Sequence, residues 1–489
     1  MSLVRTALAL LPVLSMAADQ PQWGQAWTRN LVASEKGLPS CFDPATKRNV
    51  KWVAGLGTQT HSTPMMAGGR VFVGTNNANP RDPKHIGDRG VLMCLDEKDG
   101  HLLWQLVVPK LEDDKYLDWP DTGMSSEATI DGDRAYLVTN RGEVVCLDVR
   151  GLSNGNDGPC QEEGRHMAPR GQPAMTPGPL DADILWLLDM KVTCGIWCHD
   201  GAHSSILIHG DHLYVNTGTG VDNTHRLIRR PEAPSLIVVD KNTGRYLARD
   251  DEHISPDIFH ATWSSPSLAE VADRPVIFFC GGNGMTYAFE PLATPAPDHA
   301  VATLKKLWQY DLDPDAPKTK VHFYTQNRQE GPSNIYGMPV IANGRLFVAG
   351  GGDVFWGKNQ SWLKCVNPRD GKEIWSHNLG KHTLSTAAVH DGLVYVTDAD
   401  GTLHCMDEKT GSGAWTHSMN GPFWASPMIA DGKVHLGTRK GNFCVLAAGR
   451  EKKVLCNLEL QSPISATVTA ANGVVYLATM KHLWALKAE

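Results

Sequence analysis

The sequence lacks several features that would point to common functions. No hydrophobic run approaches the roughly 20 residues that a membrane-spanning helix needs. It has no Gly-rich phosphate loop and no H-E-x-x-H motif, so neither nucleotide binding nor zinc-protease chemistry of those types is indicated. It also lacks a long basic run, and 46 Lys and Arg against 53 Asp and Glu give a net charge of −7. We therefore expect no nucleic-acid partner, because phosphate neutralisation needs clustered basic residues.

Aromatic residues are scarce except for tryptophan. There are 15 Trp against 11 Phe and 10 Tyr. A repeated structural feature that uses Trp would explain this excess.

The first 17 residues are typical of a signal peptide. Arg5 precedes a short apolar stretch from Ala7 to Leu14, and Ser15-Met16-Ala17 resembles a cleavage site. We therefore expect an exported, periplasmic or extracellular protein. A buried N-terminal strand or helix is the alternative.

A repeat of about 40 residues fills most of the chain. Copies start at Thr386, Ser426 and Ala466, and a complete copy has three short alternating strands separated by Gly turns and a fourth strand that often ends in Trp. Four short strands at this period are the signature of a β-propeller blade. The earlier copies are more diverged; they start near Thr63, Ser126, Ser205, Ser265 and Met338.

These copies predict an all-β, eight-bladed propeller, with seven blades as the runner-up. The last copy has only three strands, and the segment Asn49–Trp52 would supply the fourth and close the ring. We expect a signal peptide over 1–17, an N-terminal extension over 18–44 and a single propeller over 45–489.

Five of the eleven cysteines occupy one position in the third strand of the repeat. Equivalent strands of adjacent blades lie about 10 Å apart, which is too far for a disulfide. We therefore expect these five to be small buried core residues, namely Cys94, Cys146, Cys365, Cys405 and Cys444.

Long insertions predict a functional face. Most of them fall in loops that leave blades 1–5 on the same side of the disc, whereas blades 6–8 keep the minimal period. Because loops on a rigid scaffold carry function, this face is the candidate site. Decoration or a docking surface is the alternative reading.

One loop on this face concentrates reactive side chains. The run from Cys194 to His203 contains Cys198, His199 and Asp200. Its cysteine spacing disfavours haem attachment, while a Cys/His metal site is chemically feasible. A local Cys194–Cys198 disulfide or simple burial is the preferred reading, so no metal ligands are assigned.

Other polar and aromatic residues converge on the same face. Convergent His, Asp and Arg beside Trp rings suit a flat polar ligand such as a sugar, a quinone or a peptide. Each His alone is more commonly a loop hydrogen-bonding residue. The candidate ligand-binding residues are His199, His203, Asp222, His225, His260, Trp263, Arg328, Tyr336, Trp356 and Trp424.

The repeat G-x-L/V-x-C/A-L-D-x-x-x-G-x-x-x-W resembles the blade of pyrroloquinoline-quinone-type (PQQ-like) propellers. Local runs such as Gly220–His225 and His260–Pro266 look like exported PQQ-like proteins of planctomycete-type bacteria. The resemblance covers residues 45–489.

This resemblance implies a choice between cofactor-dependent and cofactor-free relatives. Quinoprotein alcohol dehydrogenases of this fold use a vicinal Cys-Cys ring, a Trp floor and a calcium ion held by Glu and Asn beside a catalytic Asp. This sequence has no Cys-Cys pair and no recognisable calcium set, so its cofactor is unknown and PQQ with calcium is not supported. A related propeller in outer-membrane protein assembly binds protein partners without a cofactor, and the fold alone does not decide function.

Three functional hypotheses follow. The first is a propeller that binds a small molecule, a glycan or a protein partner on the face of blades 1–5. The second is a quinone-dependent oxidoreductase acting on an alcohol or sugar, with Asp222 or Asp353 as base. The third is a polysaccharide lyase or hydrolase that uses His199, His225 and Arg328.

Overall fold

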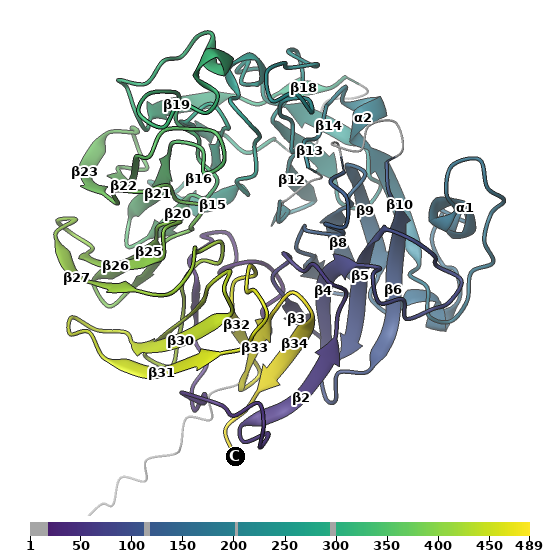
Figure 1. Ribbon diagram of the computed structural model, residues 1–489. Coiled ribbons are helices and arrows are strands. Elements are labelled where there is room, and N and C mark those ends of the chain that lie inside the picture. Colours follow the sequence, from purple (N-terminus) through teal and green to yellow (C-terminus); the bar gives the residue numbers. More distant parts are fainter. Residues whose placement is uncertain (1–17, 112–117, 201–203, 294–299) are drawn as a thin grey trace, which may run out of the picture.

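The computed structural model describes residues 18–111, 118–200, 204–293 and 300–489. These residues form eight β-sheets arranged as blades around a central axis (Figure 1). The prediction of eight blades is confirmed over the described residues, and the seven-bladed alternative is wrong. The predicted signal peptide, residues 1–17, lies outside the described residues.

The first four blades are built in chain order from the innermost strand outwards. Blade 3 carries one additional short strand, β18, which pairs parallel to its outer edge. The strands are β3 (Met65–Ala67), β4 (Arg70–Asn76), β5 (Arg89–Asp96) and β6 (Leu102–Pro109) in blade 1; β7 (Thr129–Asp131), β8 (Arg134–Val138), β9 (Glu143–Asp148) and β10 (Ile184–Asp189) in blade 2; β11 (Leu207–His209), β12 (His212–Asn216), β13 (Leu236–Asp240), β14 (Tyr246–Arg249) and β18 (Ala302–Thr303) in blade 3; and β15 (Ser267–Glu270), β16 (Pro275–Cys280), β17 (Met285–Phe289) and β19 (Lys306–Asp311) in blade 4.

The remaining blades follow the same plan, with two contributions from the N-terminal part of the chain. The strands are β20 (Val340–Ala342), β21 (Arg345–Gly351), β22 (Ser361–Val366) and β23 (Glu373–Asn378) in blade 5; β24 (Ala388–His390), β25 (Leu393–Thr397), β26 (Thr402–Asp407) and β27 (Gly413–Ser418) in blade 6; β1 (Val32–Ala33), β28 (Met428–Ala430), β29 (Lys433–Gly437), β30 (Asn442–Ala447) and β31 (Val454–Glu459) in blade 7; and β32 (Thr469–Ala471), β33 (Val474–Ala478), β34 (His482–Leu486) and β2 (Val50–Gly55) in blade 8.

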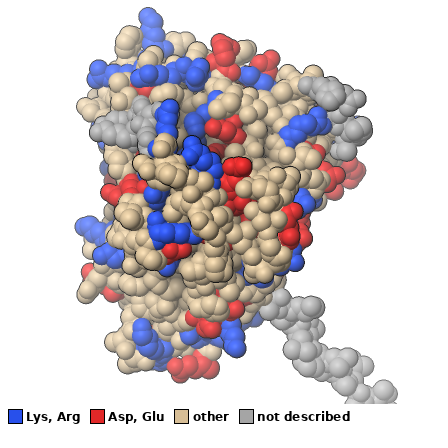
Figure 2. Space-filling model, turned by 90° about the vertical axis from the view of Figure 1, so that its right-hand side faces the viewer, with Lys and Arg blue, Asp and Glu red and all other residues tan. Residues whose placement is uncertain are grey.

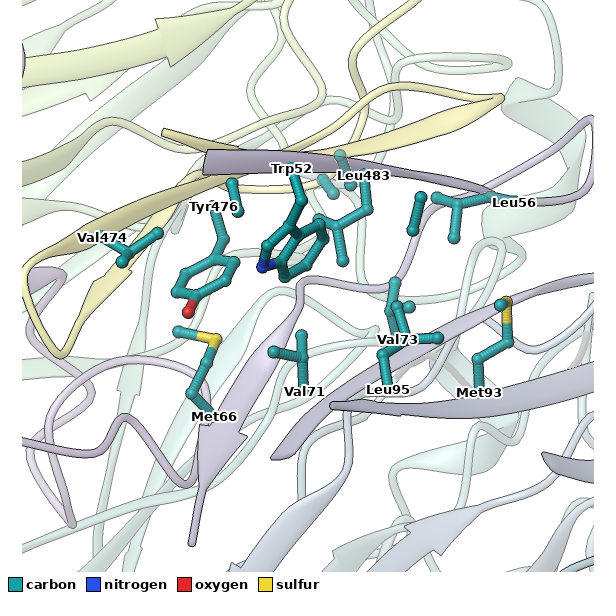
Figure 3. Close-up of a cluster of buried hydrophobic side chains, with 14 of the residues drawn as sticks. Trp52, Leu56, Met66, Val71, Val73, Met93, Leu95, Val474, Tyr476 and Leu483 are labelled. Carbon is teal, nitrogen blue, oxygen red and sulfur yellow. The ribbon is translucent and has the colours of Figure 1, made fainter. Parts of the chain in front are cut away.

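Blade 8 joins the two ends of the described chain. Strand β2 pairs antiparallel with β34, with Val53 opposite Trp484 (Figure 1). The Trp52 side chain from β2 points into the core between blades 8 and 1, where it packs among Tyr476, Val71 and Leu95 (Figure 3). Burial of these apolar groups is the main favourable contribution to holding adjacent blades together.

Six Trp residues in outermost strands dock their blades onto the next one; blades 3 and 7 lack this Trp. The Trp52 indole N–H donates to the Glu97 carbonyl at 3.0 Å, and its ring covers Gly100 so closely that a Cβ there would lie 2.6 Å away. The repeat therefore needs Gly at this turn because only Gly leaves room for the ring. The same indole bond is made by Trp104, Trp186, Trp308, Trp375 and Trp415.

The N-terminal extension contains a segment, residues 20–35, that crosses the propeller axis; we call it the axial segment. It exchanges backbone or side-chain hydrogen bonds with every blade. Its partners, from blade 1 to blade 8, are Met66, Ile130, Ile208, Leu268, Ile341, Val389, Ile429 and Gly473.

Arg29 anchors the axial segment at the centre of the ring. Its guanidinium is fully buried and donates to the carbonyls of Trp23, Ser205 and Pro266 and to the Ser205 hydroxyl. Further along the chain, a disulfide joins Cys41 to Cys456 in β31. Neither the path of this segment nor this disulfide was predicted from the sequence.

The five repeat-position cysteines are buried free thiols, as predicted. Cys194 and Cys198 are also separate buried thiols, so the candidate disulfide between them is not formed in this structure. The reason is local: Cys194 follows the short helix α2 (Met190–Thr193), whereas Cys198 pairs with Thr219 and faces Gly142.

Helices are few and short. Besides α2, the structure contains α1 (Glu163–Met167) in the connection between β9 and β10. No helix among the described residues is long and apolar enough to cross a membrane. On the side of the ring shown in Figure 2, acidic and basic side chains are interspersed.

Candidate functional site

A cavity of about 500 Å³ lies on the propeller axis. Its wall is made by the segments that lead into the innermost strands and by loops on the same face, and Trp23 of the axial segment also lines it. In blade 1, for example, Thr63 lines the cavity, and Met66, which follows it in the sequence, is hydrogen-bonded to the axial segment. The axial segment therefore closes the channel beneath the cavity.

Aromatic side chains dominate this wall. Trp263 lies with its ring centroid 4.8 Å from that of Tyr336, and Phe355 packs edge-on against both Trp263 and Trp424. The Arg439 guanidinium stacks 4.2 Å from the Trp424 ring centroid. Such walls bind the flat faces of cyclic ligands and leave polar edges to nearby hydrogen-bonding groups.

A buried carboxyl group adds polarity to this wall. Glu127 accepts a hydrogen bond from the Thr63 amide at 3.1 Å. Burial raises the pKa of Glu127 to about 7, although the Thr63 amide and the charge of Arg29 pull it the other way. Glu127 can therefore accept or donate a hydrogen bond near neutral pH.

Three loop segments are held together by backbone hydrogen bonds beside the cavity. The amide of His199 donates to the Gly218 carbonyl, and the amide of Val221 donates to the His260 carbonyl. Gly220 lies between them, where a Cβ would be 2.5 Å from the His260 oxygen and 2.9 Å from the His199 Cβ. This close approach requires Gly, and it brings two histidines from different blades into contact.

The histidines belong to a chain of buried polar groups. His199 Nε2 lies 2.9 Å from His260 Nε2, and His260 Nδ1 lies 2.9 Å from Asp353 Oδ2. The Tyr336 hydroxyl donates to the same Asp353 oxygen. His225 completes the group, with its ring centroid 5.0 Å from that of His199 and 5.1 Å from that of His260.

The protonation of these rings follows from their partners. His199 Nδ1 lies 2.8 Å from the Val221 carbonyl, which accepts hydrogen bonds only, so Nδ1 carries the proton and Nε2 a lone pair. Burial lowers the pKa of His199 well below its usual value. Burial also works against protonation of His260, but the charge and hydrogen bond of Asp353 leave its pKa above the usual value.

Asp353 and Arg328 fix the loop that carries Phe355 and Trp356. Asp353 Oδ1 accepts hydrogen bonds from the amides of Phe355 and Trp356 at 2.9 and 2.6 Å. Arg328 donates to the carbonyls of residues 354, 355 and 357. Both residues thus position cavity-lining aromatics.

The structure brings most of the predicted ligand-binding residues together. His225, His260, Trp263, Tyr336, Trp356 and Trp424 line the cavity. His199 lies behind them, in contact with His260. His203 lies outside the described residues.

The predicted bases are placed differently. Asp222 is buried within its own loop, where it accepts from Thr224 and from Arg229 Nε. Asp353 is fully buried behind His260. Neither carboxylate lines the cavity.

Several site residues were not found from the sequence. Glu127, Phe355 and Arg439 line the cavity, and Arg29 lies beneath it. Glu127 directly follows the serine that opens the second copy of the repeat, so the repeat alignment could have placed it at the channel. No comparable signal marks Arg29.

The ring of eight sheets defines a β-propeller with the PQQ-like fold. The family model that matches is described as outer membrane protein assembly factor BamB, over residues 20–155 and 359–454. No curated protein sequence matches this chain significantly.

Solved structures share this fold at low sequence identity. BamB from Moraxella catarrhalis is 12% identical, with a TM-score of 0.56 over 88% of this chain and 98% of that one. A europium-containing methanol dehydrogenase is 14% identical, with a TM-score of 0.60 over 94% and 89%. A quinohemoprotein alcohol dehydrogenase from Pseudomonas putida is 11% identical, with a TM-score of 0.57 over 96% and 80%.

The residues around the cavity do not fit a calcium-bound quinone. Calcium takes six to eight oxygen ligands, but among the described lining residues the carboxylates are Glu127 and Asp200. Glu127 is bound by the Thr63 amide and lies beside the Arg29 charge. The groups that converge on this wall are imidazole nitrogens.

Proposed function

We propose that this protein binds a small cyclic, hydroxyl-bearing ligand of the sugar class in the axial cavity. The observation that carries the proposal is the aromatic-walled cavity of about 500 Å³. This volume lies within the range of small-molecule sites, which combine apolar walls with a few polar groups. Trp263 and Trp424 would contact the ring faces, while Glu127 and Arg439 would contact the hydroxyl groups.

The cavity favours a small molecule over a protein segment. Its wall is contributed by all eight blades around one axis, and the axial segment closes the far end. A peptide threading through the ring would meet that segment. Binding of a protein on the outer loops is left as an outcome of the test.

Fluorescence titration of the full chain tests this proposal. A panel of monosaccharides and disaccharides is titrated against the protein in EDTA, with ubiquinone analogues and short peptides in parallel. We expect saturable quenching by a sugar, weakened at least tenfold in Trp263→Leu and Trp424→Leu. Trp362→Phe, a change in β22 outside the cavity, should bind as the parent does.

Each alternative result has a clear reading. Quenching by peptides alone would replace the proposal with a partner-binding function. Dye reduction with an alcohol or sugar after addition of quinone and calcium would support the oxidoreductase hypothesis. Release of shortened glycan without an electron acceptor would support a lyase or hydrolase.

We also propose that the chain is exported. The N-terminal pattern ending at Ala17 supports this, and so does the Cys41–Cys456 disulfide, because disulfides persist in oxidising compartments. Mass spectrometry of protein from the periplasm and medium should find an N-terminus at Ala18. An intact Met1 terminus on cytosolic protein would contradict export.

A further inference from the structure

We propose that His199, His225 and His260 form a binding site for one divalent late transition metal ion, of the zinc or copper class, in the wall of the axial cavity. The ligand nitrogens of the three histidines all lie within 4.8 Å of one another. This inference goes beyond the proposed ligand binding and rests on the histidines alone.

The distances suit a metal ion. Zinc binds imidazole nitrogens at about 2.0–2.1 Å, which places neighbouring nitrogens of a tetrahedral site roughly 3.4 Å apart. The His199–His260 separation of 2.9 Å and the 4.8 Å limit for the whole set lie on either side of this value. Small side-chain rotations therefore bring all three nitrogens to one ion.

The hydrogen bonds of the two buried rings direct lone pairs at the same point. His199 Nδ1 donates to the Val221 carbonyl, and His260 Nδ1 donates to the Asp353 carboxylate. Both neutral rings then present an unprotonated Nε2, and these two atoms face each other at 2.9 Å. At this distance the two nitrogens can share one proton in a hydrogen bond, and a metal ion that both coordinate would take the place of that proton.

The surroundings match the outer shell of a metal centre. Metal-binding histidines commonly donate their second N–H to a carboxylate or a backbone carbonyl, and His260 and His199 have one of each. Tyr336 and two backbone amides hold Asp353 in turn. His260 is therefore fixed in the tautomer that ligation requires.

The site would keep a position open towards the cavity. His225 and His260 line the cavity, as does Asp200, whose Oδ2 lies 3.4 Å from His199 Nε2. Three protein ligands with one open position characterise catalytic rather than structural zinc sites. An oxygen atom of a cavity ligand, or a water molecule that Asp200 orients, would occupy that position.

Imidazole donors decide the class of metal. Nitrogen ligands suit zinc and copper, whereas calcium and magnesium prefer oxygen. The other candidate groups among the described residues contain at least two carboxylates each, for example Asp96, Asp99 and His101. They provide internal controls for non-specific binding.

Metal uptake by the full chain tests the site. The protein is stripped with EDTA and titrated with Zn²⁺ and, separately, Cu²⁺, with calorimetry for affinity and elemental analysis for stoichiometry. We expect one ion per chain, with binding lost in His225→Ala and His260→Ala and kept in His101→Ala. Co²⁺ loading should give visible d–d absorption of a low-coordinate site, which His225→Ala abolishes.

A conservative variant tests the orientation of His260. In Asp353→Asn the amide can donate to Nδ1, which would place the ring proton on Nε2 and block ligation. We expect affinity to fall about 10–100-fold. Thermal unfolding in EDTA shows whether each variant is folded, and His225→Ala should match the parent because its ring is only half-buried.

Two results would overturn the inference. One is the absence of stoichiometric uptake by the folded parent protein. The other is binding that is lost in His101→Ala but kept in His225→Ala. Because the sugar titration is run in EDTA, failure of metal uptake and failure of sugar binding are distinguishable.

Discussion

Blades 3 and 6 share a plan of four antiparallel strands, but they differ in the link between the second and third strands, and blade 3 adds the short strand β18. Trp186 docks blade 2 onto blade 3 through the Lys241 carbonyl and Gly244, just as Trp375 docks blade 5 onto blade 6 through the Glu408 carbonyl and Gly411. The link between the second and third strands is 217–235 in blade 3 but only 398–401 in blade 6.

The comparison shows that the contacts that dock the blades and the residues of the candidate site lie in different parts of the blades. The docking contacts lie between the sheets and are insensitive to the length of the loops on the cavity face. His199, His225 and His260 all belong to the elaborated connections around blades 3 and 4. The plain blades complete the ring and add Trp424 and Arg439 to the cavity wall, whereas the elaborated blades supply the three histidines.

The largest expected loss of stability comes from removing a Trp that docks one blade onto the next. Trp375→Ala removes a buried ring and an indole hydrogen bond, and should lower the free energy of unfolding by about 3–5 kcal/mol. Trp356→Ala, on the elaborated face, should cost about 1 kcal/mol or less because its side chain is half-buried. Urea denaturation of both variants measures the contrast. Equal losses would remove the distinction between the two regions.

A smaller effect distinguishes two buried glutamates by pH. Burial raises the pKa of Glu127 in the folded protein to about 7. The stabilising contribution of the protonated Glu127 is therefore fully present below the pKa of the unfolded chain, and it is lost as the pH rises through about 7. Stability should therefore fall between pH 5 and pH 8 by up to about 3 kcal/mol from this group. Glu127→Gln should remove that fall in urea denaturation at the two pH values.

Glu143 in β9 should respond in the opposite direction. Burial opposes its ionisation, but His166 and Arg141 hold the pKa of Glu143 below its usual value. Its contribution is present above the unfolded pKa and is lost as the solution becomes acidic. Glu143→Gln should therefore lose stability at neutral pH.

If the stability of Glu127→Gln fell as steeply with pH as that of the parent protein, the assignment of the pH dependence to Glu127 would be contradicted.

A modest change in stability should accompany a strong effect on the metal site. Gly220→Ala introduces a Cβ against the His260 carbonyl and the His199 side chain. We expect a loss of about 1–2 kcal/mol in the free energy of unfolding, together with loss of metal uptake. Gly449→Ala, where a Cβ meets no atom within 4 Å, is the matched control. Unchanged metal uptake in Gly220→Ala would show that the loop contact does not set the site.

The repeat made the architecture predictable from the sequence. The spacing of Gly turns, Trp and Cys identified the blades because each copy solves the same packing problem between neighbouring sheets. The sequence also placed Trp263 and Trp424 on the candidate face, and in the structure both lie shortly before the innermost strands β15 and β28. These are local consequences of a periodic pattern.

The contacts among the site residues could not be predicted from the repeat. His199 and His260 are 61 residues apart, and their contact depends on the Gly220 crossing of two insertions that follow no repeat. The axial segment bonds mainly through its backbone, which leaves no side-chain pattern to detect. The Cys41–Cys456 pairing depends on that path as well.

The axial segment also constrains the order in which the molecule can be completed. Residues 20–35 are synthesised before any blade, yet their partners extend to Gly473 in the last one. Contacts of such high sequence separation form late and slowly. The axial segment therefore stays bonded to only some of its partners until the final blade has been synthesised. A chain interrupted before β32 would have neither a closed ring nor a fully bonded axial segment.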